Sequence, residues 1–316
     1  MVEWNNVQRA LRPGQLVRGA PGKRPSIVIP ASGIVLAVED IRFQGIDFIW
    51  RPAADAAFDP ERLELFELCA AQATFRDCTL TAVADSTSGH PVAIRWTGPR
   101  QQRQLSPAGR LQIDGCLMRG VVAAIDCRCH SPLSISVSET LYLGPGPLVR
   151  MDRVPKIDEP LEVQLSRLTL RGAAAVVGIH IEQMPEDEPG SIVIVAHNCA
   201  FSPARGGSLV LFASAEFPGR LARSIQWSGE GSVLSAESPA AFWLPRGKNA
   251  IGREMEVRVE GIVASRLEFA GPAKAGWSES RLARWQGATQ SDEPPGISER
   301  PLNAISPIET SASSGK

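Results

Sequence analysis

Three aspartates beside a repeated sequence block have the residue type and spacing that best suit acid–base chemistry. Asp47, Asp77 and Asp114 stand at the fifth, third and second positions of their copies of that block. Enzymes that cleave glycosidic bonds place two carboxyl groups around the bond, one as acid and the other as base or nucleophile. If the copies stack in space, the three carboxylates share one edge, although their unequal positions allow only partial alignment. The sequence therefore names these three residues as its catalytic candidates.

The string Cys127-Arg-Cys129-His130 is the part of the sequence that most resembles a metal site. Thiols two residues apart lie on the same side of a strand, but a tetrahedral site needs further ligands, and the neighbouring sequence offers none. The six cysteines include no pair at the C-x-x-C spacing of a zinc or redox site. We therefore expect buried structural cysteines, no metal and no cofactor.

Residues 186–188 form a dense acidic run, Glu-Asp-Glu, between two prolines. Calcium sites need several oxygen ligands, which such a run could supply. Runs of like charge more commonly lie in solvated loops, because the charges repel one another. We predict an exposed turn here. His180 and His197 fall near strand residues and are predicted to be structural.

Four of the seven tryptophans lie in the last third of the chain, at Trp227, Trp243, Trp277 and Trp285. Aromatic faces stack on sugars and fill protein interfaces, so these rings could form a binding platform. The simpler interpretation is that they pack the last turns of the fold and close its C-terminal end. Trp227, Trp243 and Trp285 are the binding candidates that the sequence offers.

The elements that must position these residues are indicated by a recurring six-residue block. It consists of an apolar residue, two residues that are often polar or glycine, then Ile, Leu or Cys, one further residue, and an apolar residue. Counted at the fourth position, copies fall at residues 46, 78, 116, 140, 168, 199 and 262, and a missing copy is expected within 225–235. A period of roughly 24 to 38 residues suits one coil of a β-solenoid, with three short strands and three turns.

Each block predicts two short strands separated by a bend, and the segments between blocks lack the 3.6-residue period of amphipathic helices. Strands such as residues 192–195 are apolar at consecutive positions, as in buried parallel sheets. The predicted fold is therefore all-β, a right-handed parallel β-helix of about eight irregular coils. Cys78, Cys116 and Cys199 share the fourth block position, which predicts an internal stack of small side chains.

The ends of the solenoid are predicted to differ from its body, because exposed edges of parallel strands invite pairing with other chains. Residues 3–12 place Trp4, Val7 and Leu11 on one helical face, so residues 1–14 are predicted to form a cap. Residues 15–287 are predicted to form the β-helix. Residues 288–316 are rich in Ser, Pro and Glu and are predicted to be a disordered tail.

The composition limits the classes of partner. Charged residues make up 21% of the chain, its net charge is −1, and the charges are spread without blocks, which argues against nucleic acid. No apolar stretch reaches the length of a membrane span. The first residues lack the basic start and apolar run of a secretory signal, which predicts a cytoplasmic protein if Met1 is the true start. A polysaccharide or a protein remains as the expected partner.

The blocks resemble right-handed β-helix proteins of the pectin-lyase-like superfamily, and the β-helix regions of large planctomycete proteins. The resemblance spans roughly residues 15–270 and rests on the segments 38–48, 73–80 and 227–231. It implies architecture and no reaction. Polygalacturonase-like members carry a Gly-His-Gly string, which this chain lacks; its nearest string is Gly89-His90-Pro91. Some planctomycete relatives join a serine/threonine kinase to the β-helix, but the kinase triplets His-Arg-Asp and Asp-Phe-Gly are absent from this sequence.

Three functional hypotheses follow from the sequence. The first is a binding or scaffolding module that uses the long face of a parallel sheet and has no catalytic site. The second is a carbohydrate-active lyase or hydrolase whose site is assembled from aspartates or arginines on neighbouring coils. The third is a regulatory appendage of a serine/threonine kinase system. The lining of the solenoid's lateral face distinguishes the first two.

Overall fold

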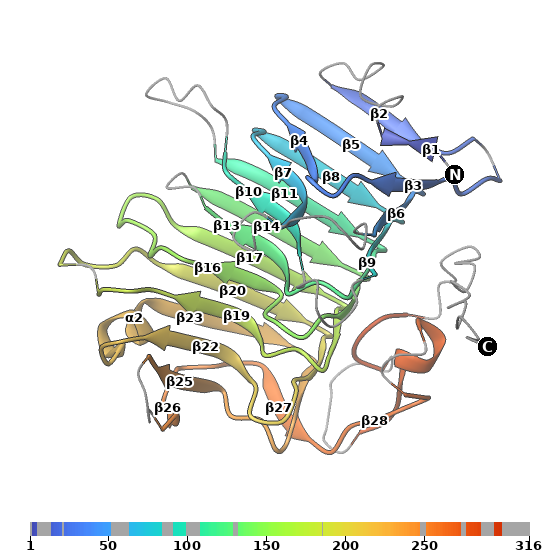
Figure 1. Cartoon of the computed structure of the whole chain (residues 1–316). Helices are drawn as coiled ribbons and strands as arrows, with labels where there is room; N and C mark the ends of the chain where they lie inside the picture. Colours follow the sequence, from blue (N-terminus) through green and yellow to red (C-terminus); the bar gives the residue numbers. More distant parts are fainter. Residues whose placement is uncertain are drawn as a thin grey trace, which may run out of the picture.

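The chain folds into a parallel β-helix, which confirms the predicted fold class (Figure 1). The computed structural model describes residues 2–4, 14–20, 22–51, 63–83, 91–98, 108–128, 132–184, 186–246, 251–272, 276–285 and 294–298. Within them, the strands form three long sheets, which we call A, B and C. Successive strands join the sheets in the order B, A, C, and this order repeats through eight coils. No helix of the described residues is long and apolar enough to span a membrane.

The three sheets run along the axis of the solenoid. Sheet B contains β2 (Gln15–Arg18), β5 (Asp40–Gln44), β8 (Gln72–Arg76), β11 (Gly109–Asp114), β14 (Leu133–Ser138), β17 (Leu161–Ser166), β20 (Ile192–His197) and β23 (Ile225–Glu230). Sheet A contains β1 (Val2–Glu3), β3 (Ser26–Ile29), β6 (Asp47–Trp50), β9 (Thr79–Ala82), β12 (Leu117–Arg119), β15 (Leu141–Leu143), β18 (Thr169–Arg171), β21 (Ala200–Ser202), β24 (Ser232–Ser235) and β27 (Ile262–Ser265). Sheet C contains β4 (Ile34–Leu36), β7 (Glu64–Leu68), β10 (Val92–Trp96), β13 (Ala123–Cys127), β16 (Val149–Met151), β19 (Ala175–His180), β22 (Ser208–Ser214), β25 (Ala241–Pro245) and β26 (Arg253–Met255).

The repeated sequence block is the sharp corner between sheets B and A. The corner residue adopts a positive φ in the left-handed region, and the residue after it points into the core. The corner residues are Gly45, Asp77, Gly115, Glu139, Arg167, Asn198, Gly231 and Gly261. The inward residues that follow are Ile46, Cys78, Cys116, Thr140, Leu168, Cys199, Ser232 and Ile262. The predicted missing copy is thus the corner at Gly231 and Ser232.

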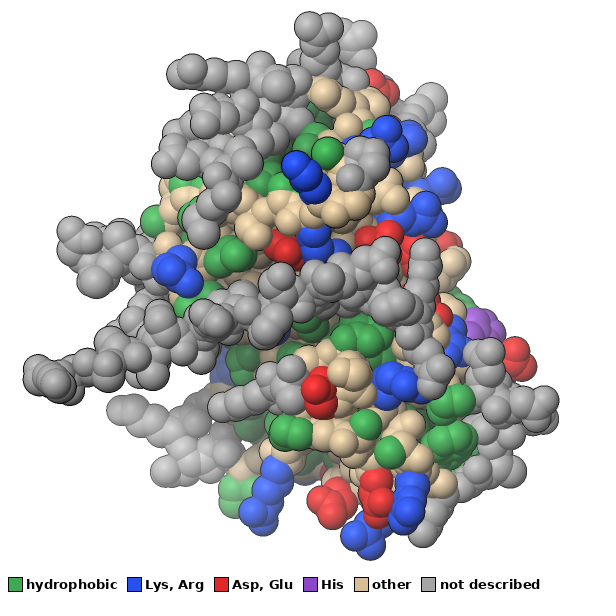
Figure 2. Space-filling model, turned by 90° about the vertical axis from the view of Figure 1, so that its right-hand side faces the viewer, with side chains coloured by type: hydrophobic (Ala, Val, Ile, Leu, Met, Phe, Trp, Pro, Cys, Tyr) green, Lys and Arg blue, Asp and Glu red, His purple; other side chains and the backbone are tan. Residues whose placement is uncertain are grey.

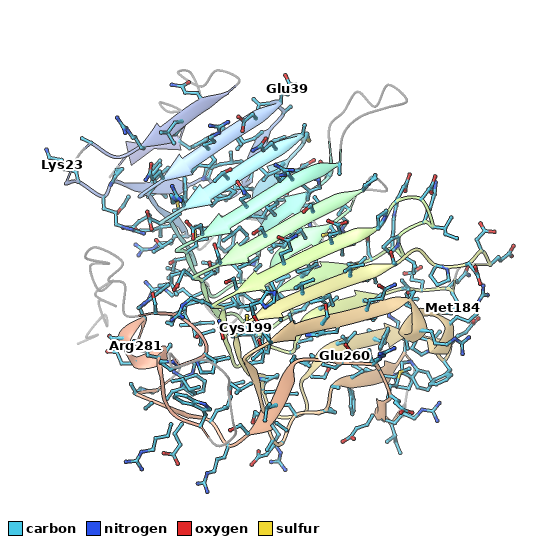
Figure 3. The ribbon with its side chains drawn as sticks, turned by 180° about the vertical axis from the view of Figure 1, so that it is seen from behind. Lys23, Glu39, Met184, Cys199, Glu260 and Arg281 are labelled. Atoms are coloured by element: carbon cyan, nitrogen blue, oxygen red, sulfur yellow. The ribbon has the colours of Figure 1, made fainter. Side chains whose placement is uncertain are left out.

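The three cysteines predicted to stack occupy the inward position of this corner, but only Cys78 and Cys116 are neighbours, because Thr140 and Leu168 separate Cys116 from Cys199. Cys78, Cys116 and Cys199 are fully buried, and Figure 3 labels Cys199 where the strands of sheet B end. Burial raises the pKa of the Cys199 thiol to about 12, so the side chain remains a neutral thiol. The same inward position accepts larger apolar side chains as well, such as Ile46 and Leu168, which are also buried.

The core of the first coils is aromatic, and farther along it becomes aliphatic. Phe43, Phe48, Phe66 and Phe75 are completely buried, and their ring centroids lie 4.9 to 5.7 Å apart. Burying each ring stabilises the fold by about 2 kcal/mol. Later coils fill the same space with Leu, Ile and Val. Each coil therefore supplies side chains from all three sheets to one continuous core.

Both ends of the solenoid have features outside the regular coils. At the N-terminal end Glu3, where the predicted capping helix begins, belongs instead to strand β1, and Trp4 is buried against Phe43. Residues 5–12 of the predicted helix lie outside the described residues. At the other end β26 joins sheet C antiparallel to β25, and the short helix α2 (Gly219–Ser224) precedes β23.

The last described residues return to the side of sheet A, which Figure 2 shows in space-filling form. They include β28 (Glu268–Phe269), the 3₁₀ turn η2 (Ser278–Ser280) and β29 (Leu282–Arg284). Leu282 packs against Ala200 and Val233 of sheet A. Within the predicted tail 288–316, residues 294–298 are described and also lie on sheet A; the rest of that tail falls outside the described residues.

Candidate functional site

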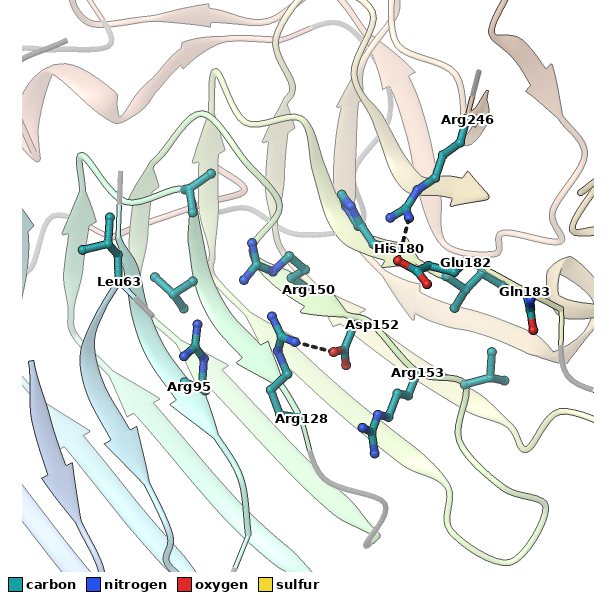
Figure 4. Close-up of a pocket in the computed structure, with 14 residues that line it drawn as sticks. Leu63, Arg95, Arg128, Arg150, Asp152, Arg153, His180, Glu182, Gln183 and Arg246 are labelled. Carbon is teal, nitrogen blue, oxygen red and sulfur yellow. Dashed lines mark hydrogen bonds and ion pairs between the residues drawn. The ribbon is translucent and has the colours of Figure 1, made fainter. Parts of the chain in front are cut away.

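A groove of about 820 Å³ lies over the outer face of sheet C (Figure 4). Its polar lining comprises Arg95, Arg128, Arg150, Arg153, Arg246, His180, Asp152, Glu182 and Gln183. Pockets of this volume are in the range that holds small molecules or a short segment of a polymer. The preponderance of guanidinium groups distinguishes this groove from an ordinary apolar pocket.

The register of sheet C brings the central residues of the groove together. Arg95 of β10 is paired with Asp126 of β13, Asp126 with Arg150 of β16, and Arg150 with Gly178 of β19. Side chains at paired positions of neighbouring strands point to the same face, so these residues form one column on the outside. Asp152 and His180, each two residues beyond a member of that column, extend the face toward the loops that follow β16 and β19.

Asp126 is the centre of the groove's charge network. Its Oδ1 accepts a hydrogen bond from Arg150 Nε at 2.9 Å, and its Oδ2 accepts from Arg128 Nε at 2.9 Å and Arg95 Nε at 3.3 Å. The Asp126 side chain is 0% exposed. Burial by itself would raise the pKa of Asp126, but the ion pairs with Arg150 and Arg128 outweigh burial and hold it below the ordinary value. The carboxylate therefore stays charged and fixes three guanidinium groups.

The terminal guanidinium nitrogens of Arg95, Arg128 and Arg150 have different partners. Arg95 Nη1 lies 2.6 Å from Glu64 Oε2, and Arg128 Nη1 lies 2.5 Å from Asp152 Oδ2. Among the described residues, Arg150 makes no hydrogen bond or ion pair through its terminal nitrogens. Gly178, its neighbour in register, has no side chain, and a Cβ placed there would lie 2.8 Å from the Pro147 ring and 3.1 Å from His180 Nε2. The Arg150 Nη groups are thus available to a ligand.

His180 lines the same groove as Arg150, and its Nε2 lies beside Gly178 (Figure 4). Its Nε2 is buried and has no hydrogen-bond partner among the described residues. Burial, followed by the charges of Arg150 and Arg246, lowers the pKa of His180 to about 4. At neutral pH the ring is therefore neutral, with an unsatisfied polar atom that a ligand could engage.

The three predicted aspartates lie elsewhere, around the corner between sheets B and A. Asp47 Oδ1 contacts Arg24 Nε at 2.5 Å and accepts a hydrogen bond from Thr79 Oγ1 at 2.6 Å. Asp114 contacts Arg76 Nε at 3.0 Å and accepts from Ser138 Oγ at 2.8 Å. Asp77 is the corner residue itself, with φ of 51°. None of the three lines the groove on sheet C.

The predicted tryptophans are spread over the C-terminal part of the fold rather than gathered in one platform. Trp227 is buried in the core, edge-on to Phe201 at 6.0 Å. Trp243 packs edge-on against Phe217, and its Nε1 donates to Ser214 Oγ at 3.1 Å.

Trp285 packs beside the cluster of Leu282, Ala200 and Val233, and lines a smaller pocket of about 450 Å³ together with Arg266 and Arg284. Trp277 packs against a separate apolar cluster on sheet A. All four rings thus contact side chains in the C-terminal part of the fold, and Trp285 also lines a pocket.

The remaining chemical candidates have structural surroundings. Cys127 is buried, while Cys129 and His130 lie outside the described residues. Among the residues that are described, no group of three or more His, Cys, Asp or Glu side chains could hold a metal. The acidic residues 186–188 are exposed, as predicted for a turn. His197 Nδ1 lies 3.8 Å from Glu230 Oε1 at the surface.

The arginines of the groove were missed by the sequence analysis, although a signal for them exists. In the third strand of three successive coils, one charged residue interrupts an apolar run. The three strings are Ala-Ile-Arg95-Trp, Ala-Ile-Asp126-Cys and Leu-Val-Arg150-Met. Aligning these short strings would have placed the three charges in one column. Comparisons of the chain with protein-family models, curated proteins and solved structures found no match. The function must therefore be argued from the chemistry of the groove.

Proposed function

We propose that this protein is a binding module whose groove on sheet C takes an anionic ligand. The observation that carries the proposal is the arrangement of Arg95, Arg128 and Arg150 around the buried carboxylate of Asp126. One carboxylate holds the inner Nε edge of each guanidinium, so the arginines are ordered before a ligand arrives. Preorganised donors lose little conformational entropy on binding, which favours affinity.

The charge of the groove supports an anion rather than a neutral ligand. Five arginines line it, and four carboxylates, those of Glu64, Asp126, Asp152 and Glu182, lie within ion-pair distance of them. The pair between Arg246 and Glu182 is loose, at 3.9 Å, and both side chains are well exposed. Arg150 and Arg246 therefore offer the guanidinium edges that a carboxylate, sulfate or phosphate group would bind.

An acidic oligosaccharide is the first ligand class to test. The resemblance to pectin-lyase-like β-helices supports a sugar framework, and the guanidinium groups support acidic substituents on it. Binding of an oligogalacturonate and of a heparin hexasaccharide should be measured by isothermal titration calorimetry, with a neutral dextran oligomer for comparison. We expect one of the acidic probes to bind, with an affinity that falls as salt rises.

Arg150→Gln is the variant that tests the site itself. Loss of a charge-assisted hydrogen bond is worth about 1.5–3 kcal/mol, so the affinity should fall about 10- to 100-fold. Arg258→Gln is the matched control, because Arg258 is an exposed arginine paired with Glu260 and outside the groove. Equal affinity of the two variants, or binding of the neutral probe alone, would refute the proposal.

A carbohydrate-active enzyme is the second candidate, and the neutral His180 is the observation that favours it. Its buried, unpartnered Nε2 lies in the same groove as Arg150, and an unprotonated imidazole can accept a proton. A polyuronate panel, with and without calcium, tests this directly by the appearance of reducing ends or unsaturated products. We expect any activity to be abolished by His180→Gln; activity that survives this change would place the proton acceptor elsewhere.

A further inference from the structure

The outer face of sheet A holds a short segment of the chain's own C-terminal region. Pro294 to Ser298 cross three successive coils, and their backbone donates to each of them. Gly296 N donates to Asn198 O at 2.6 Å, Ile297 N to Thr169 Oγ1 at 3.0 Å, and Ser298 N to Glu139 Oε2 at 2.9 Å. The segment thus runs across the strands and back toward the start of the solenoid.

Two residues of this segment, Gly296 and Ile297, fit closely against sheet A. Ile297 is 3% exposed and packs against Leu117 and Leu141, which lie on neighbouring strands of sheet A. Gly296 has φ of 92°, and a Cβ added to it would lie within 2.4 Å of Thr169 Oγ1. A residue larger than glycine would therefore be strained and would collide with the sheet. The contact selects glycine followed by an apolar residue.

Two neighbouring groups complete the contact. Trp277 packs on the same apolar cluster, and its Nε1 donates to Ser298 O at 3.3 Å. Glu139, the acceptor for Ser298 N, is held by Arg167 Nε at 2.6 Å. Side chains therefore hold both main-chain groups of Ser298, the N–H through Glu139 and the C=O through Trp277.

The solenoid does not depend on this segment for its hydrogen-bond ladder. The strands β15, β18 and β21 are each paired with both neighbours in sheet A. Main-chain hydrogen bonds and a pocket for one side chain are the two elements by which proteins recognise short peptides, and this contact contains both.

We propose that sheet A carries a recognition site for a short peptide with the sequence Pro-Gly-apolar-Ser, and that residues 294–298 are its resident ligand. The site is separate from the groove on sheet C and does not depend on the function proposed for that groove. A free peptide of the same sequence would bind to it whenever the resident segment is displaced.

The test is performed on the full chain with a fluorescently labelled peptide of residues 291–301. Ile297→Asp displaces the resident segment, because a carboxylate cannot occupy the slot between Leu117 and Leu141. Ile251→Asp is the matched control, since Ile251 is 86% exposed and lies outside the contact. Displacement is read from the ¹⁹F resonance of 5-fluorotryptophan at position 277, assigned with Trp277→Phe.

We expect the labelled peptide to bind Ile297→Asp about 100-fold more tightly than it binds the wild type or the control, because a tethered segment competes at millimolar effective concentration. Unlabelled peptide should compete, whereas a peptide carrying Gly296→Val should not. If Ile297→Asp loses its native circular dichroism, full-length Gly296→Val takes its place. A shifted Trp277 resonance without peptide binding, or a resonance that the substitution leaves in place, overturns the proposal.

Discussion

Replacing Asp126 by asparagine should destabilise the fold strongly, although the two side chains have nearly the same shape. The carboxylate accepts three guanidinium hydrogen bonds and is completely buried. An amide offers one oxygen, and its NH₂ group would face N–H donors. Arg95 and Arg128 keep second partners in Glu64 and Asp152, while Arg150 keeps none among the described residues. Removing one partner of a buried ion pair costs about 3–5 kcal/mol. Because Arg95 and Arg128 keep their second ion pairs, we expect the free energy of unfolding to fall by about 3 kcal/mol.

The measurement is the free energy of unfolding from urea denaturation of the wild type and two variants. Asp152→Asn is the matched control, because it removes the same charge from a side chain that is 26% exposed and contacts Arg128 alone. An exposed ion pair contributes about 0–1 kcal/mol, so the control should unfold at nearly the wild-type urea concentration. Equal losses in the two variants would falsify the view that Asp126 anchors the groove.

The pH dependence gives an independent check on the same residue. Its pKa in the folded protein lies below the ordinary value of 3.8, so the folded state binds the proton less readily than the unfolded state. The stability that Asp126 contributes is therefore fully present above the unfolded-state pKa and is lost as the pH falls through the folded-state pKa. The difference between wild type and Asp126→Asn should be constant from about pH 5 to 7 and should shrink below about pH 4.

Three further predictions concern the core and the corner. Phe75→Ala should cost about 3–5 kcal/mol in unfolding free energy, because the ring is fully buried against Phe43 and Phe66, whereas Ala at the half-exposed Phe217 should cost far less. Asp77→Gly should leave the free energy of unfolding unchanged or raise it. Asp77→Val should lower the free energy of unfolding by about 1–3 kcal/mol, because a β-branched residue is strained at φ of 51°. A valine variant more stable than the glycine variant would contradict the corner geometry. Cys78, Cys116 and Cys199 should resist iodoacetamide at pH 8 until urea is added, as followed by mass spectrometry, since all three thiols are buried.

The fold could be predicted from the sequence because its corner has strong local requirements. A left-handed residue followed by a small or apolar inward residue recurs in every coil after the first, as at Gly115 and Cys116. That requirement depends on two adjacent positions, so it survives loops of unequal length. Even the coil whose block was hard to recognise keeps it, with Gly231 before Ser232.

The groove could not be predicted in the same way, because its contacts join positions far apart in the chain. Arg95 and Asp126 are separated by 31 residues, and Asp126 and Arg150 by 24. The irregular loops between them conceal which residues share a column. The docking of residues 294–298 was hidden for another reason: it uses main-chain N–H groups, which leave no trace in a Ser- and Pro-rich composition.

The connections between the three sheets differ in length, and this difference determines where the chain can accept insertions. Between sheets B and A the chain turns in one or two residues in every coil after the first, whereas the loops after sheet C vary from three residues to more than ten. The rim of the groove, including Arg153 and Gln183, belongs to those variable loops. Insertions there would reshape what the groove selects while the rise from coil to coil stays constant. Ligand preference and architecture can therefore diverge independently in descendants of this chain.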